Sequence, residues 1–415
     1  MLTGTSAWAG QADLSLETRL GGDSNVFRQE KRDHPKLTSD GTFDLSPRVG
    51  FRDENDDLPY SFDYQPTYRK FMTTSGITGV DHIAHGKVGW RMTPLDSLEA
   101  SGSYFNGRQF LFGTQGTGST FSSVNDRERI RISDGNLGYR RSLTPQLSLR
   151  VQGILNDFDA SGTSPNSQTD SRVYTGRVAL DYDLDALTEL GLSTSGRYRQ
   201  NRAVGIFRPS STTEVWDVMA SVSRKLSPTW SVSVQAGPSI IRQQQIPGGG
   251  RDPSSASCVP GSFSTTCDRY AKDEKSKVTA FAAASIKKQW KVSDLTVSYV
   301  RSESRSGTVN SSSAINDEID VDGSYRINDR IVLRASGAWS RYSQVAKQQA
   351  LANKFKIDAY RASGVAEFIV SRRIMLLGQY TYAHQDNSNS LGGSSSVGVH
   401  TGYVAIRYSF ESLSY

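Results

Sequence analysis

The five histidines of this 415-residue chain are the first residues to test for chemistry. His82 and His85 lie three positions apart, which places two side chains of an extended strand on opposite faces, so this pair cannot share a site. His34 and His384 lie in polar segments, where solvated histidines are common. The sequence contains no GxSxG, HExxH or Walker pattern. We therefore expect a protein that is not an enzyme and has no metal or cofactor, although a Ser–His pair stays open in a chain this rich in serine.

Arginine is the residue type that offers a binding chemistry, since 34 of the 48 basic residues are arginines. Its planar guanidinium suits bidentate contact with carboxylate and phosphate groups. Ten arginines fall on the charged face of extended segments, and we predict that they line a lumen and contact solute. They are Arg48, Arg69, Arg91, Arg131, Arg150, Arg177, Arg197, Arg199, Arg334 and Arg361. Acidic residues accompany them, so a structural network of ion pairs is the alternative interpretation.

These arginines belong to segments in which apolar and polar residues alternate. In segment 60–69, tyrosine, phenylalanine and proline alternate with serine, aspartate, glutamine, threonine and arginine. This period of two is typical of a strand with one apolar and one charged face. Similar segments of about ten to fourteen residues recur along the whole chain, with no linker between them. The pattern predicts an all-β protein with a single domain.

Composition limits the class of protein further. Only 36% of the residues are hydrophobic, the mean hydropathy is −0.49, and no stretch approaches the length of about 18 apolar residues that a membrane helix needs. A membrane β-barrel is compatible with these values, because alternation averages its hydropathy away. The net charge of +6 is spread over the chain without a basic cluster, so we expect no nucleic-acid partner.

Connections of two kinds separate the alternating segments. We identify eight short turns and nine long polar segments, which gives eighteen strands, and sixteen if a loop has been divided. Even strand numbers, short periplasmic turns and long outer loops are typical of bacterial outer-membrane barrels. We predict a single transmembrane antiparallel up-and-down β-barrel in the outer membrane of a Gram-negative cell, with both termini in the periplasm.

Tyrosine and tryptophan residues cluster near the expected strand ends. Such residues form girdles where a barrel crosses the two membrane–water interfaces, and we predict this role for ten of them. They are Trp90, Tyr104, Tyr139, Trp216, Trp230, Trp290, Trp339, Tyr380, Tyr403 and Tyr408.

The two cysteines, Cys258 and Cys267, lie close together in a polar segment rich in glycine, serine and proline. Such a pair predicts one local disulfide formed in an oxidising compartment. Two free thiols are the alternative, and two ligands are too few for a zinc site.

The ends of the chain agree with export. Residues 1–9 include Ala7-Trp8-Ala9, which has the form of a signal-peptidase site, and we interpret them as a truncated signal-peptide remnant. Residues 10–415 then form the barrel. The last strand, at about 397–410, ends in an aromatic residue and is similar to the final strands that barrel-assembly machinery recognises.

Segment 21–28 reads GGDSNVFR and resembles a motif near the start of the β-barrel porin 2 family. Segments 45–51 and 60–98 also look like that family, and the similarity is strongest over residues 10–150. The family consists of outer-membrane barrels encoded beside exopolysaccharide synthesis and export systems. The resemblance therefore implies a conduit or scaffold for exopolysaccharide, with polysaccharide and periplasmic export components as partners.

Architecture alone supports a different function, a general or anion-preferring diffusion porin for small hydrophilic solutes. Such a channel narrows its lumen with an inward loop, for which segment 107–127 and the cysteine segment are the candidates. Membrane lipid, including lipopolysaccharide, is a partner under either function, and the oligomeric state stays open.

Overall fold

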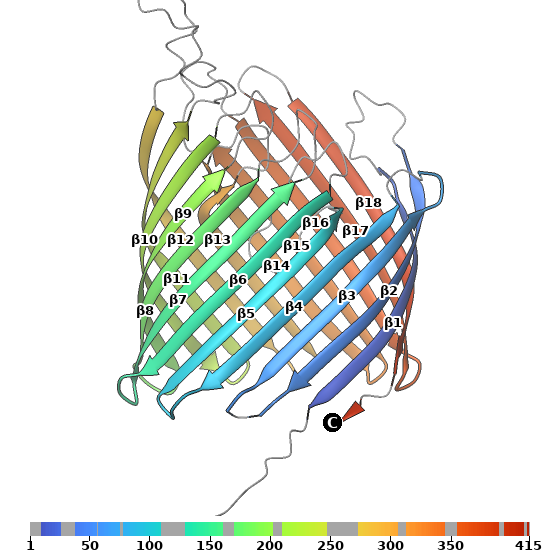
Figure 1. Ribbon diagram of the computed structural model, residues 1–415, viewed down its shortest axis with the longest axis horizontal. Coiled ribbons are helices and arrows are strands. Elements are labelled where there is room, and N and C mark those ends of the chain that lie inside the picture. The colour runs from blue at the N-terminus through green and yellow to red at the C-terminus, as the bar shows by residue number, and fades with distance from the viewer. Residues whose placement is uncertain are drawn as a thin grey trace, which may run out of the picture.

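In the computed structural model the chain forms one closed, all-antiparallel barrel of eighteen long strands that follow one another around the wall (Figure 1). The structure describes residues 10–25, 38–55, 57–74, 78–108, 129–160, 170–201, 210–246, 273–305, 313–344, 355–389, 394–410 and 413–414. The strands are β1 (Gln11–Asp23), β2 (Asp40–Asp53), β3 (Tyr60–Phe71), β4 (Gly79–Arg91), β5 (Asp96–Arg108), β6 (Arg129–Ser142), β7 (Leu147–Ala160), β8 (Ser171–Asp183), β9 (Thr188–Asn201), β10 (Ser210–Ser227), β11 (Trp230–Ile246), β12 (Asp273–Gln289), β13 (Ser293–Arg305), β14 (Ser313–Asn328), β15 (Ile331–Gln344), β16 (Phe355–Ile369), β17 (Ile374–Asn389), β18 (Ser394–Ser409) and the short β19 (Leu413–Ser414). The predicted eighteen-stranded barrel is confirmed, and the sixteen-stranded alternative is wrong.

The barrel closes where the last long strand pairs with the first. β18 pairs with β1 from Ser15↔Ser409 to Asp23↔Thr401, and β19 pairs with β1 at Gln11 and Ala12, so it continues the same edge and adds no position around the wall. The Arg407 guanidinium of β18 donates to the buried Glu17 carboxylate of β1 with its Nε at 2.7 Å. This contact ties together two strands that are 390 positions apart in the chain.

The motif at the end of β1 also belongs to this seam. The Ser24 amide donates to the His400 carbonyl at 3.0 Å, and the His400 amide donates back to the Ser24 hydroxyl at 2.9 Å. Asn25 is fully buried, and its amide donates to the Asp23 carboxylate at 2.9 Å. These residues of the motif therefore extend the β1–β18 pairing.

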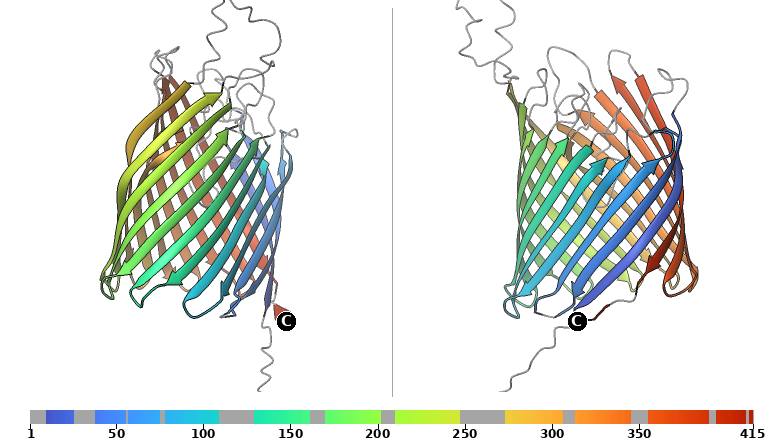
Figure 2. Two further views of the ribbon diagram at one scale, coloured as in Figure 1. Left: turned by 60° about the vertical axis from the view of Figure 1, so that its left-hand side comes forward. Right: turned by 45° about the vertical axis from the view of Figure 1, so that its right-hand side comes forward.

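One rim of the barrel carries short turns and the opposite rim carries the long connections, and we name these rims the turn end and the loop end. The first strand begins and the last strand finishes at the turn end (Figure 2). Turns that begin with Ser/Thr-Pro are closed by local hydrogen bonds from backbone amides to the hydroxyl of that Ser or Thr. The Asp96 amide donates to Thr93 Oγ1 at 3.0 Å, and the Leu147 amide donates to Thr144 Oγ1 at 3.0 Å.

Alternation produces an apolar outer surface over the middle of the barrel. The register of β6, β7 and β8 brings Leu137, Val151 and Val178 to the outer face, where each is exposed. Aromatic residues border this surface near both rims, and at the turn end Lys288 Nζ lies 4.2 Å from the Trp230 ring centroid. The band is long, exposed and apolar, which suits contact with hydrocarbon.

One of the ten residues predicted for the aromatic girdle faces the lumen instead of the outer surface. Tyr403 lies on the inward face of β18, where its hydroxyl donates to Gln379 at 2.6 Å and the Arg19 guanidinium lies 5.0 Å from its ring. It pairs in register with Gly21, so it belongs to the inner side of the seam, and its predicted interfacial role is wrong.

Candidate functional site

The pairing register assigns each side chain to the lumen or to the outer surface, because cross-strand partners lie on the same face of a sheet. Nine of the ten arginines expected in the lumen lie on its face. They are Arg48 (β2), Arg69 (β3), Arg91 (β4), Arg150 (β7), Arg177 (β8), Arg197 and Arg199 (β9), Arg334 (β15) and Arg361 (β16).

Arg131 is the exception, and its predicted place in the lumen is wrong. It pairs in register with Asn106 and Asp159 on the outer surface, where it forms an ion pair with the Asp159 carboxylate. Ile130 and Ile132 occupy the inward positions on either side of it. The physical reason is that the two faces of β6 exchange polarity near the loop end, so charge lies outside and apolar side chains lie inside.

Acidic residues of neighbouring strands pair with several lumen arginines. Arg69 donates to both oxygens of the Asp44 carboxylate at 2.7 Å, and Arg150 donates to Asp181 at 2.8 Å. Arg48 pairs with Asp63, and Arg334 pairs with Glu367. These contacts brace the wall, so part of the arginine set has the structural role that was the alternative interpretation.

Charged side chains of both signs line the lumen. Arg140, Arg150, Arg177 and Arg197 face inward from the consecutive strands β6 to β9, together with the acidic Asp134, Asp181, Asp183 and Glu189. Glu318, Asp320 and Asp322 follow one another on the inward face of β14, next to Arg334 and Arg361 of β15 and β16. A passage lined in this way presents positive and negative groups to a charged solute.

The wall opens between β12 and β13 near the loop end, whereas the hairpin of β13 and β14 stays paired with β15 as far as Ala314↔Gln344. Pairing between β12 and β13 ends at Ala282↔Arg301, whereas pairing between β13 and β14 continues to Arg305↔Ser313. Over the same height β12 stays paired with β11 as far as Gln245↔Asp273. The tip of the β13–β14 hairpin is therefore free of β12 and bends away from it.

Ion pairs fix where this hairpin tip lies. Arg199 of β9 grips the Glu303 carboxylate of β13 with two donors, Nη1 to Oε1 at 2.7 Å and Nη2 to Oε2 at 3.2 Å. Arg197 Nη1 donates to the same carboxylate at 3.1 Å and to the Glu303 carbonyl at 3.2 Å. β9 and β13 are four positions apart around the wall, roughly 19 Å at the usual strand spacing, so the hairpin must cross the inside of the barrel to make this contact.

Apolar packing accompanies the ion pairs. Ile315 of β14 forms a buried cluster with Val215 of β10 and Ile241 of β11. Ile315 pairs in register with Glu303, so one face of the hairpin tip supplies both contacts. Inward residues of β9 to β11 are buried over a wide area next to it, and they are Ser193, Ser195, Arg199, Asn201, Thr213, Val215, Asp217, Met219, Ser239, Ile241 and Gln243.

Sequence reasoning missed this inward hairpin. The segments expected to narrow the lumen were 107–127 and the cysteine segment. Residues 109–127, Cys258 and Cys267 lie outside the described residues. Residues 1–9, with the expected signal-peptide remnant, lie outside them as well. A signal was present, because Val215 and Ile241 place apolar side chains on a face that is polar farther down the same strands. Alternation along β13 assigns Glu303 to the outer face of the barrel. The alternation contains no information about the bend that turns this face of the hairpin toward the inner face of β9.

The described residues offer no other chemistry of note. No group of three or more His, Cys, Asp and Glu side chains in them is arranged to hold a metal ion. Within the same residues there is no helix long and apolar enough to cross a membrane.

Fold and lumen together define a closed antiparallel barrel with an apolar outer band and a charged interior. No family model matches the chain, and no curated protein does either, so the resemblance to the β-barrel porin 2 family stays a prediction. Among solved structures, the chain is similar to OccK2 (OpdF) of Pseudomonas aeruginosa in complex with glucuronate, with 8% identity, a TM-score of 0.45 and 98% of each chain covered.

Two further solved structures show similarity of the same degree. Acinetobacter baumannii OccAB3 has 10% identity and a TM-score of 0.44, over 97% of this chain and 99% of that one. The ferric-catecholate import receptor Fiu of E. coli K12 has 6% identity and a TM-score of 0.47, over 96% of this chain and 81% of that one. Similarity at this level assigns neither a family nor a substrate.

Proposed function

We propose that the protein is an outer-membrane channel for hydrophilic solutes, with both chain ends in the periplasm. The observation that carries the proposal is the opposed polarity of the two barrel surfaces. An exposed apolar band surrounds the middle of the barrel, while arginine and acidic side chains line the inside of the same strands. Rings of charged side chains are one of the general devices by which pores select ions and solutes.

The lumen charges support selection by electrostatics. Arginines face the lumen from many strands and the chain carries a net charge of +6, which favours anions over cations in the passage. The hairpin tip occupies the lumen beside Arg197 and Arg199 and pairs with both, so it narrows the passage there. We therefore propose a weak preference for anions.

Exopolysaccharide passage is the more specific candidate. The resemblance of segment 21–28 to exopolysaccharide-associated barrels favours it, and arginines repeated along the lumen provide many weak contacts for acidic sugars. Weak, repeated contacts suit transport, since a solute that binds tightly at one site cannot leave. Under this candidate the partners are the polymer and periplasmic components that deliver it.

Conductance of the purified full-length protein in planar bilayers tests the channel. We expect stepwise conductance and a reversal potential that indicates weak anion preference in a salt gradient. Absence of conductance from correctly folded protein, identified by its heat-modifiable migration on gels, would contradict the channel function. Cation preference would show that the acidic side chains of the lumen govern the passage.

The two candidates are then separated with solutes. Liposome swelling in small neutral sugars reports a diffusion porin, whereas block of the current by an acidic polysaccharide added to the turn-end side favours polymer passage. An acidic polysaccharide that leaves the current unchanged from both sides would contradict the exopolysaccharide candidate and leave the diffusion porin standing.

A further inference from the structure

The wall of the barrel has a lateral opening between β12 and β13. Pairing of these two strands stops at Ala282↔Arg301, and the described residues of β12 nearer the loop end, Asp273–Phe281, pair with β11 alone. On the other side of the opening, Glu303 of β13 contacts Arg199 of β9 instead of β12. The loop-end half of β12 therefore has a strand edge without a neighbour among the described strands.

Side chains on both faces of β12 are uncovered along this opening. Val278, on the outward face, is 70% exposed, which is the highest value among the large hydrophobic residues that the structure describes. Ala280 on the same face and Lys277 on the inward face are exposed as well. The edge of β12 is therefore accessible both from the outer surface and from the lumen.

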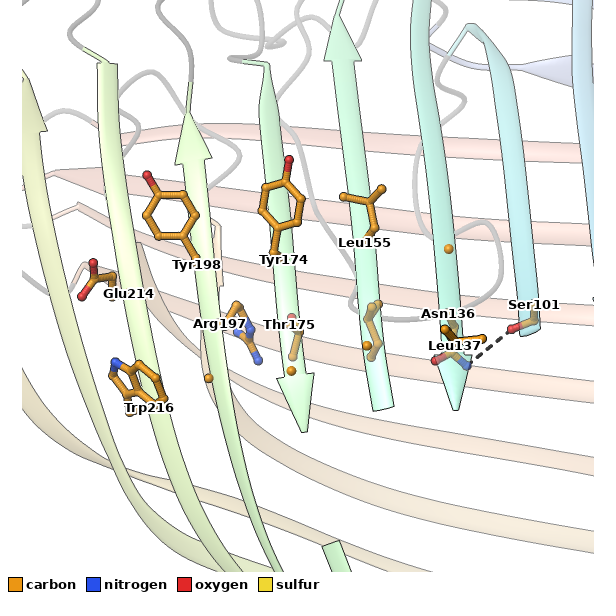
Figure 3. Close-up of a pocket in the computed structure, with 15 residues that line it drawn as sticks. Ser101, Asn136, Leu137, Leu155, Tyr174, Thr175, Arg197, Tyr198, Glu214 and Trp216 are labelled. Carbon is orange, nitrogen blue, oxygen red and sulfur yellow. Dashed lines mark hydrogen bonds between the residues drawn. The ribbon is translucent and has the colours of Figure 1, made fainter. Parts of the chain in front are cut away.

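The opening crosses the border of the apolar outer band. Outward residues of β12 are apolar as far as Val278 and become polar at Ser276. Aromatic residues mark the same border on β8, β9 and β10, where Figure 3 shows Tyr174, Tyr198 and Trp216 on the outer surface. In the membrane proposed above, the turn-end part of the opening faces hydrocarbon and its loop-end part faces the polar headgroups.

An unpaired strand edge at this position needs a physical reason. Closed barrels cross membranes because the backbone amides and carbonyls of the wall pair with each other, and an unpaired group in hydrocarbon is costly. Unpaired backbone is tolerated where it lines a water-filled cavity. The edge of β12 meets this condition when the opening connects with the aqueous lumen.

Apolar side chains continue from the opening along the inner face of the wall. Phe281 is the first inward residue of β12 beyond the last β12–β13 pair. On the adjacent strand β11, the inward Ile241 forms a buried cluster with Val215 and with Ile315 of the hairpin tip. A hydrocarbon chain that enters through the opening meets Phe281 directly and reaches Ile241 when the hairpin tip moves aside.

We propose that the lateral opening is a side passage for amphipathic solutes between the lumen and the surrounding membrane. The hydrocarbon chain of the solute passes between β12 and β13, over Val278 and Ala280 outside and Phe281 inside, while its polar head stays in the lumen. The two media that the opening joins select this class of solute, because the outer band is apolar and the lumen carries charged groups. This activity goes beyond the channel proposed above and rests on the same membrane location.

Fluorescence quenching in proteoliposomes tests whether a chain reaches the inner face. A bimane label is attached to Thr279→Cys, inward at the opening, in the full-length protein with Cys258→Ser and Cys267→Ser. The quencher is terminally brominated dodecanoate, and brominated butanoate has the same head without the chain. We expect saturable quenching by dodecanoate and little by butanoate at equal concentration. A label at Ser285→Cys, on the inward face about 20 Å farther along β12 where the wall is closed, should not be quenched.

A charge at the outer lip of the opening tests the route of the chain. Val278 has little packing to lose, so Val278→Asp should fold as judged by heat-modifiable migration, but its carboxylate opposes passage of hydrocarbon. We expect the dodecanoate concentration at half-maximal quenching to rise about tenfold. Val404→Asp is the matched control, because Val404 is 67% exposed on the outer face of β18, where the wall is closed on both sides. The control should leave the quenching unchanged.

A disulfide across the opening provides a reversible test. Phe281→Cys combined with Ser302→Cys places two thiols at the first unpaired position beyond the β12–β13 ladder, in the same background without native cysteines. In planar bilayers, dodecanoate should reduce the current of the reduced protein and have no effect after oxidation, with recovery on reduction. The control bridge, Ala283→Cys combined with Val300→Cys, joins a pair that is already in register and should leave the block unchanged.

Three outcomes would overturn the inference. They are equal quenching of the labels at Thr279 and Ser285, equal quenching by butanoate, and a dimer that Val278→Asp dissociates, which would assign the edge of β12 to a second copy. A protein that conducts ions without quenching of the Thr279 label contradicts this inference alone. Quenching in a folded protein that does not conduct contradicts the proposed channel instead.

Discussion

The two ends of the barrel are constructed differently. At the turn end, structure is local: Thr93 closes its turn through the amide of Asp96, three positions away. At the loop end, structure is long-range: Glu303 is held by Arg199, which is 104 positions away. The comparison shows which features of a barrel can be predicted from the alternation pattern of its strands. Local contacts repeat along the sequence with the strands, whereas contacts across the lumen depend on how the hairpin bends.

The same contrast appears in the polarity of the two faces. In the middle of β6, Leu137 faces outward and Asn136 faces the lumen, and the outer face is apolar. Near the loop end of the same strand, Arg131 faces outward and Ile130, which is 2% exposed, faces inward. The alternation with a period of two is unchanged along β6, but the inward residues are polar in the middle of the strand and apolar near the loop end. Farther around the wall, Val215 and Ile241 are inward apolar residues of the same kind, and Ile315 of the hairpin packs against them.

The largest effect is expected from placing a charge in the packed contact of the hairpin. Val215 is 1% exposed in the cluster with Ile241 and Ile315. Val215→Asp loses this packing and buries a carboxylate without a designed partner, so we expect a loss of about 4 kcal/mol in unfolding free energy. Urea unfolding in detergent measures it. Ser221→Asp, on the same strand and face toward the turn end, should change stability by less than about 0.5 kcal/mol.

Single-channel recordings of the same pair of variants extend this prediction. Val215→Asp should release the hairpin and produce larger, noisier conductance, whereas Ser221→Asp, which adds the same lumen charge away from the hairpin, should not increase the noise of the current. Equal stability and equal conductance in the two variants would mean that the hairpin does not depend on its apolar contact with β10 and β11.

A somewhat smaller effect is expected from the ion pairs that hold the hairpin. Glu303→Gln leaves the guanidinium groups of Arg197 and Arg199 without their carboxylate in a buried site, and we expect a loss of about 3 kcal/mol. A double-mutant cycle with Arg199→Gln should give a coupling energy of about 1–3 kcal/mol. Additive effects in that cycle would show that Glu303 and Arg199 do not interact in solution. Glu318→Gln, on the same hairpin farther toward the turn end, is the control.

Selectivity should respond to charge in the lumen and ignore charge outside it. Replacing Arg140, Arg150 and Arg177 together with glutamine removes three positive charges from the lumen while leaving the hairpin contacts in place. We expect the reversal potential to move toward cation preference, without loss of insertion, because the apolar outer face is unchanged. Arg131→Gln, on the outer surface, is the matched control and should leave the reversal potential unchanged. A shift of equal size in the control would contradict the assigned faces.

The sequence predicts the strands well, since alternation and Ser/Thr-Pro turns are local signals. Segment 60–69 is one example, because its apolar residues all lie on the outer face of β3, as expected. The exceptions have non-local causes. Arg131 was assigned to the wrong face because polarity changes along a strand without any change of period. Glu303 was not recognised because its partners lie on β9, and nothing in the local pattern indicates a bend of the hairpin.

The smallest effect is expected at the turn end, where a carboxylate closes a turn in solvent. The Leu187 amide donates to Asp185 Oδ1 at 2.7 Å, and this backbone hydrogen bond holds the pKa of the Asp185 carboxyl below its usual value. A carboxyl whose pKa is lowered by folding stabilises the folded state above its unfolded pKa, and the contribution disappears as the pH falls through the lowered folded pKa. We expect Asp185→Asn to lower stability slightly at neutral pH and to leave it unchanged below the lowered folded pKa, so a small part of the acid sensitivity of unfolding is lost. Urea unfolding measured between neutral and acidic pH for both proteins provides the test. Because Asp185 acts only on its own turn, its substitution should leave the conductance and the hairpin contacts unchanged, and a change in either would mean that the two ends of the barrel are coupled.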